Sequence, residues 1–97
     1  MLLYEKKVSS FPKLVDELRI LDLDAGVRTI GKYQSKKCLV FVTRSLNGYT
    51  AALYGIKSAG KEKLPDKRLL IKEFGSLEEL EQFLTGAVAK PVEAFAY

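Results

Sequence analysis

An Asn-Gly pair at positions 47 and 48 separates two runs of residues that have the period-two pattern of β-strands. Asn and Gly adopt positive φ angles readily, and this pair is typical of a two-residue type I′ turn between antiparallel strands. The flanking pattern predicts strands at residues 37–45 and 49–57. The centre of the chain is therefore expected to be a β-hairpin.

The predicted turn sets the register of the hairpin. Counting back from it places Phe41 opposite Tyr54. A further strand is expected at residues 27–34, and a turn at residues 35–36 would place Ile30 opposite Phe41. Three consecutive antiparallel strands follow from these turns.

Side-chain alternation sorts the three strands into two faces. The first face carries Arg28, Ile30, Lys32, Leu39, Phe41, Thr43, Ala52, Tyr54 and Ile56. The second carries Thr29, Gly31, Tyr33, Cys38, Val40, Val42, Ala51, Leu53 and Gly55. On the second face Gly31 and Gly55 flank Val40 and leave room for close approach, so we expect the helices to pack there. The first face then remains uncovered.

Two helices are expected outside these strands. After a short strand at residues 2–8, Ser9 or Ser10 caps a helix with Pro12 in its first turn. Its apolar stripe consists of Phe11, Leu14, Val15, Leu18 and Leu21. Ser76 and Glu79 form the capping box of a second helix, which is expected to stop at Gly86.

The remaining segments complete an α+β fold. The sequence predicts a mobile, mostly basic loop at residues 58–66 and a further strand at residues 67–74. Residues 90–97 alternate like a strand, but Pro91 confines it to an edge. We therefore expect one domain over residues 1–97, with an antiparallel sheet of four to five strands and two helices packed on one face, in the order strand, helix, four strands, helix.

Several chemistries are disfavoured by composition. The chain has no histidine, and its single cysteine, Cys38, lies in an apolar strand. Asp22 and Asp24 supply too few oxygen ligands for a hard metal ion. Residues 55–61 have the glycine and lysine spacing of a P-loop, but Glu62 replaces its Ser or Thr. We expect a protein that is not an enzyme and has no metal or cofactor.

The composition also suggests where the protein works. The longest apolar stretch, residues 38–42, is too short to span a membrane, and charged residues follow soon after the amino terminus, so a cytoplasmic location is expected. Few Asn, Gln, Cys and Met residues beside many Lys and Glu favour a thermophilic source.

Positive charge is concentrated in one part of the chain. Residues 28–72 contain eleven basic residues and two acids, a net charge of +9, whereas the whole chain carries +4. This excess lies on the predicted strands, and basic grooves with exposed rings hold single-stranded nucleic acids. The hypothesis is that Phe41 and Tyr54 stack bases. The full predicted site is Arg28, Ile30, Lys32, Phe41, Arg44, Tyr54, Lys57, Lys61 and Lys63.

The organisation resembles a known family. Lys32-Tyr33, Leu39-Val-Phe41, Asn47-Gly-Tyr49 and Leu53-Tyr54 form a basic, aromatic sheet over about half the chain. With the preceding strand and helix and the closing capped helix, this arrangement is similar to the ThermoDBP-related single-stranded DNA-binding proteins of thermophilic archaea. The resemblance implies bases sheltered in a cleft with little sequence preference, and assembly into homo-oligomers, dimers or larger. Single-stranded DNA is therefore the first expected ligand and RNA the second.

Two other functions remain open. Cross-strand Phe and Tyr side chains are often ordinary core, and lysines often only solubilise a sheet edge. A protein-interaction module would use Phe41, Tyr54 and Ile30 as a self-association surface. A small nuclease that uses Lys, Arg or Tyr in place of His is the second alternative.

Overall fold

A computed structural model describes residues 6–23, 25–59, 62–89, 92 and 94–96 of the chain. It is an α+β structure with six strands and two helices in these residues. The elements are β1 (Lys6–Val8), α1 (Phe11–Arg19), β2 (Gly26–Tyr33), β3 (Lys36–Ser45), β4 (Gly48–Ala59), β5 (Glu62–Phe74), α2 (Leu77–Ala87) and β6 (Ala94–Ala96).

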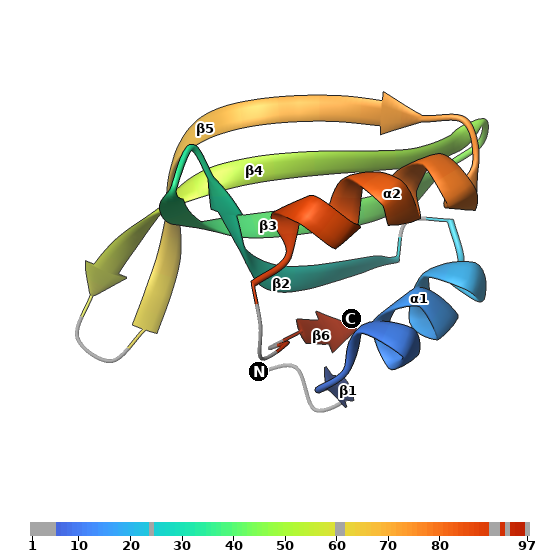
Figure 1. Cartoon of the computed structure of the whole chain (residues 1–97), viewed down its shortest axis with the longest axis horizontal. Coiled ribbons are helices and arrows are strands. Elements are labelled where there is room, and N and C mark those ends of the chain that lie inside the picture. The colour runs from blue at the N-terminus through green and yellow to red at the C-terminus, as the bar shows by residue number, and fades with distance from the viewer. Residues whose placement is uncertain (1–5, 24, 60–61, 90–91, 93, 97) are drawn as a thin grey trace.

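The strands form one antiparallel sheet in the order β1-β6-β2-β3-β4-β5, with both helices on the same side of it (Figure 1). The α+β class is as predicted, but the sheet has six strands rather than four or five. The expectation that the last strand lies at an edge is wrong, because β6 lies between β1 and β2. Pro91 precedes β6 in the sequence and lies outside the described residues.

The two turns are shifted from their predicted positions. Ser45 pairs with Gly48, so the turn is Leu46-Asn47 instead of Asn47-Gly48. Tyr33 pairs with Lys36, and the turn residues between them, numbers 34 and 35, have φ angles of 51° and 67°. Positive φ at both of these positions is the type I′ geometry, whose twist matches that of the flanking strands β2 and β3.

The pairing of β2 with β3 and that of β3 with β4 are consequently each offset by two residues from the predicted pairing. Phe41 lies opposite Ala52, not Tyr54, and Ile30 lies opposite Leu39, not Phe41. Because side chains repeat their direction every second residue, a shift of two moves each residue along the partner strand but leaves it on the same face. The predicted division into faces therefore survives the error in pairing.

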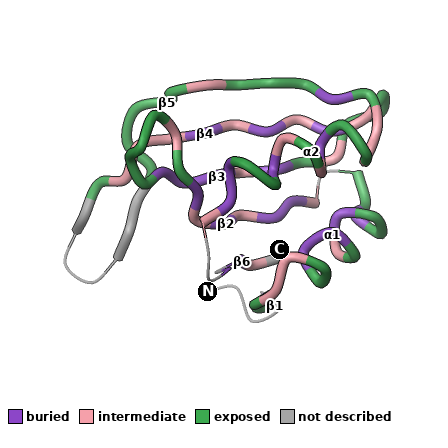
Figure 2. The backbone as a smooth tube through the Cα atoms, viewed as in Figure 1, coloured by how far each residue is buried: buried purple, intermediate pink, exposed green. Residues whose placement is uncertain are grey.

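The hydrophobic core lies between the helices and the second predicted face (Figure 2). Its fully buried side chains include Leu14 and Leu18 of α1, Leu80 and Leu84 of α2, and Val40 of β3. Complete burial of each such aliphatic side chain stabilises the fold by roughly 1.5–3 kcal/mol relative to exposure. The prediction that the helices cover this face is confirmed.

The two glycines of this face have different surroundings. A Cβ atom at Gly31 would collide with the backbone of Ala87 in α2 and with the Val40 side chain. A Cβ atom at Gly55 would only approach Lys67 and Asp66 of β5, at 3.8 and 3.9 Å. Close helix approach is therefore confirmed at Gly31 and is wrong for Gly55, where no helix atom lies within 4 Å of the added Cβ.

Serine caps begin both helices as predicted. The Ser10 hydroxyl accepts a hydrogen bond from the backbone N–H of Lys13 at 3.4 Å, and Ser76 accepts one from that of Glu79 at 3.3 Å. Such caps pair donors that the first helical turn leaves without partners. The second helix continues through Gly86 to Ala87, so the predicted stop at Gly86 is wrong.

Strands β4 and β5 form a longer hairpin than expected. Ala59 pairs with Glu62 and Ile56 with Pro65, so most of the segment predicted as a loop, residues 58–66, is strand. Pro65 is compatible with this pairing because β5 is an edge strand, where one side of the backbone needs no partner. The extended backbone at Gly55–Ala59 also differs from the tight loop of a phosphate-binding site, consistent with rejecting the P-loop reading.

Candidate functional site

The sheet has one face that neither helix covers, which we call the helix-free face. Strand alternation and register place on it Lys7, Arg28, Ile30, Lys32, Lys37, Leu39, Phe41, Thr43, Thr50, Ala52, Tyr54, Ile56, Arg68, Ile71, Glu73 and Phe95. The rings of Phe41 and Tyr54 are partly exposed there, whereas neighbouring Leu39 is buried, with 6% of its surface exposed. This face is therefore an apolar surface bordered by cations.

Cations and rings alternate along one row across this face. From β1 to β5, directly paired residues are Lys7, Phe95, Arg28, Phe41, Ala52 and Ile71. Arg28 lies over the Phe95 ring, with its ζ carbon 5.0 Å from the ring centroid. This cation–π contact orients the guanidinium of Arg28 between the rings of Phe95 and Phe41. These rings lie on the two strands next to β2, and neighbouring strands are about 4.8 Å apart.

Phe41 and Tyr54 are diagonal neighbours on β3 and β4. Their ring centroids are 5.5 Å apart and the rings are nearly perpendicular, at 85°. Edge-to-face contact of this kind is favourable for aromatic pairs. Directly opposite Phe41 on β4 lies only the methyl group of Ala52, so its bulky neighbour on that strand is the diagonal Tyr54.

Two lysines face each other beside this cluster. Lys32 and Lys37 are directly paired across β2 and β3, and both are exposed. Like charges in directly opposed positions destabilise a sheet. An anion bound between the two ammonium groups would remove this repulsion.

Five residues of the predicted site are brought together on the helix-free face: Arg28, Ile30, Lys32, Phe41 and Tyr54. Lys57 is exposed, but alternation along β4 directs it to the opposite side. Lys63 lies in β5, paired with Ser58, and its side chain is not described, while Lys61 lies outside the described residues.

Arg44 does not belong to this surface, which corrects its inclusion in the predicted site. Its guanidinium donates hydrogen bonds to the Leu21 carbonyl at 3.4 Å and to the Tyr49 hydroxyl at 3.1 Å. The Tyr49 hydroxyl in turn donates to the Leu18 carbonyl at 3.1 Å. These bonds join the carboxyl-terminal end of α1 to β3 and β4, where a positive charge interacts favourably with the helix dipole. Arg44 therefore has a structural position.

Sequence reasoning missed three cations and one ring of the helix-free face. Phe95 and Lys7 enter it because β6 inserts between β1 and β2, and Arg68 because it pairs with Tyr54. Lys37 pairs with Lys32 only in the shifted register. Alternation of residues 90–97 was a usable signal for a strand, but nothing local in the sequence specifies its neighbours.

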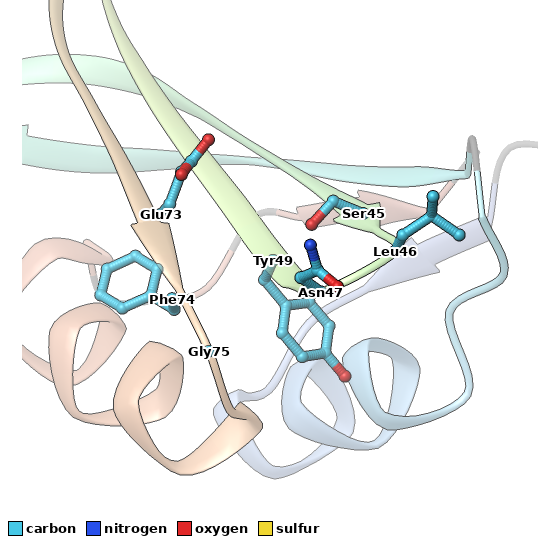
Figure 3. A pocket seen from close by; sticks show the side chains of 7 residues that line it. All are labelled: Ser45, Leu46, Asn47, Tyr49, Glu73, Phe74 and Gly75. Atoms are coloured by element: carbon cyan, nitrogen blue, oxygen red, sulfur yellow. The ribbon is translucent and has the colours of Figure 1, made fainter.

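A second feature is a hollow of about 450 Å³ at the tip of the β3–β4 hairpin (Figure 3). Two of its lining rings diverge, with Tyr49 directed toward α1 and Phe74 toward α2. Both rings have partners elsewhere, since Tyr49 bonds Leu18 and Phe74 stacks against Phe83 at 5.2 Å. The hollow lies between the β3–β4 turn and the end of β5, and Glu73 is the charged residue among its described lining.

The described residues offer little for other chemistry. Burial raises the pKa of the Cys38 thiol, although its hydrogen bond with the Gly31 backbone acts in the opposite direction. Within this part of the chain no three His, Cys, Asp or Glu side chains gather as metal ligands. Neither α1 nor α2 is long and apolar enough to cross a membrane.

Comparison of the chain with protein-family models, curated proteins and solved structures finds no match. The functional interpretation of the helix-free face therefore rests on its own geometry.

Proposed function

We propose that the helix-free face binds single-stranded nucleic acid, with DNA as the first ligand to test. The observation that carries the proposal is the row in which cations and rings alternate, from Lys7 through Phe95, Arg28 and Phe41. Single strands expose both bases and phosphates, and they are held by rings that stack the bases beside cations that pair with the phosphates. Phe41 and Tyr54 supply the partly exposed rings.

Charge distinguishes this ligand from a second copy of the same face. The described positive residues of the face are Lys7, Arg28, Lys32, Lys37 and Arg68, against Glu73 as its one described acid. Stacking two such faces would bring cations against cations, whereas a polyanion neutralises them. The directly paired lysines on β2 and β3 also favour an anionic ligand over a second copy of this face.

The test is a fluorescence anisotropy titration of a labelled oligothymidylate with the full chain, at low and high salt. We expect binding to weaken as salt rises, because phosphate contacts release condensed counterions. Duplex DNA of equal length should bind more weakly, since its bases are not available for stacking. Equal binding of both forms, or none, would contradict the proposal.

Phe41→Leu separates stacking from packing, because leucine keeps an apolar side chain but removes the ring. Loss of one stacked base corresponds to about 1–3 kcal/mol, or roughly a 5- to 150-fold weaker Kd. For the lysine variants described next, Lys13→Ala is the matched control, because it removes the same charge from an exposed position on α1. It should leave the Kd nearly unchanged.

Lys32→Ala and Lys37→Ala test the phosphate contacts. Each should lower the magnitude of the logarithmic salt slope by about 0.7, the contribution of one phosphate contact in a single strand. If either changes the Kd but not the salt slope, its role is not phosphate pairing.

A further inference from the structure

Strand β5 is the last strand of the sheet, and no described element pairs with its outer side. It is thirteen residues long and exposed over most of its length (Figure 2). Two of its apolar side chains, Leu69 and Ile71, are 39% and 50% exposed. A long edge with exposed apolar residues is a template for pairing with another strand unless it is blocked.

The two halves of this edge differ. In the first half Pro65 lacks a donor, and the register with β4 shifts on both sides of Tyr54, leaving Leu69 as an extra residue. Proline and bulges are devices that obstruct edge pairing. From Leu70 to Phe74 the pairing with β4 is regular. The second half is therefore open to an additional strand.

The second half, together with Arg68 on the far side of the extra residue, is complementary to itself. If two copies pair antiparallel about a two-fold axis at Ile71, the two Ile71 side chains oppose each other. Allowing for the extra residue at Leu69, Arg68 of each copy then lies opposite Glu73 of the other. All three lie on the helix-free face, where Arg68 pairs with Tyr54 and Glu73 with Thr50 within one chain. Among the described residues neither Arg68 nor Glu73 has an ion-pair partner.

We infer that a second copy of this chain pairs with β5 in this register, with an apolar contact at the axis and an Arg68–Glu73 ion pair on each side. Opposed side chains in antiparallel strands have Cβ atoms about 4.5–5.5 Å apart, within reach of both contacts. The pairing keeps the helices of both copies on one side of a continuous sheet, because opposed residues share a face. It also joins the two rows that end at Ile71, so the proposed nucleic-acid surface becomes continuous across the dimer.

Charge reversal tests this pairing without nucleic acid, so its result is independent of the proposed function. Sedimentation velocity of the full chain over a range of concentrations should show a monomer–dimer equilibrium. Arg68→Glu or Glu73→Arg alone places like charges opposite each other twice and should weaken the dimer on the order of tenfold, since one exposed pair changes an equilibrium by about 1.5- to 5-fold. The double variant Arg68→Glu/Glu73→Arg should restore it.

Glu78→Arg is the control, because it makes the same charge change as Glu73→Arg at an exposed position on α2. It should leave the dimer intact, and circular dichroism should show all variants folded. Ile71→Asp should abolish the dimer by placing two carboxylates at the axis. A monomeric parent chain would overturn the inference. So would single reversals without effect, or a double variant as weak as the singles.

Discussion

Replacing Gly31 by alanine tests how closely α2 approaches the sheet. The added Cβ would lie 2.6 Å from the Val40 Cγ2 atom and would also collide with the Ala87 carbonyl oxygen. Because one obstacle is backbone, α2 has to move, and overpacking of this kind costs about 1–3 kcal/mol. Alanine recovers roughly 0.5–1 kcal/mol of the entropy that glycine loses on folding. We expect a net destabilisation of about 1 kcal/mol.

Gly55→Ala is the matched control, since Gly55 is also in a strand on the same face but has no atom closer than 3.8 Å to an added Cβ. It should be neutral or stabilise by up to about 1 kcal/mol. Urea unfolding at 25 °C measures both free energies, and thermal unfolding should show melting temperatures that differ by roughly 5–15 °C, since about 1–2 kcal/mol separates the two variants. Equal stability of the two variants would refute the account of α2 packing.

Three further outcomes are expected. Tyr49→Phe leaves the Leu18 carbonyl without its donor and should reduce the free energy of unfolding by about 1–2 kcal/mol in urea titrations; an unchanged midpoint would mean that the bond is dispensable. Lys37→Glu should stabilise the fold by a few tenths of a kcal/mol, about 0.5, by pairing with Lys32, yet weaken oligonucleotide binding; lower stability would contradict the repulsion argument. Cys38 should react with thiol reagents only on unfolding. Because its folded pKa is raised, stability should fall as pH rises above the pKa of the unfolded thiol, and Cys38→Ala should lose that dependence.

The candidate site was predictable only in part. Arg28, Ile30, Lys32, Phe41 and Tyr54 share a face because alternation within a strand is a local property. Arg44 was grouped with this surface for its charge, although position 44 has the parity of Val40 and Val42 on the covered face of β3. Lys57 was grouped with the same surface for a similar reason, although position 57 has the parity of the covered face.

What the sequence determined by itself is local. Serine caps specified where both helices begin, and period-two alternation specified which strand residues share a face, even though both turns lie one residue from their predicted positions. The tertiary structure alone decided that β6 pairs with β1 and β2, bringing Phe95 beside Arg28. Pairing between residues 28 and 95 is a contact between distant parts of the chain, and the burial of Val8, Ala94 and Thr29 beneath the helices favours it. A strand's own pattern identifies its two faces but not its neighbours, because neighbours are selected by the packing of the whole core.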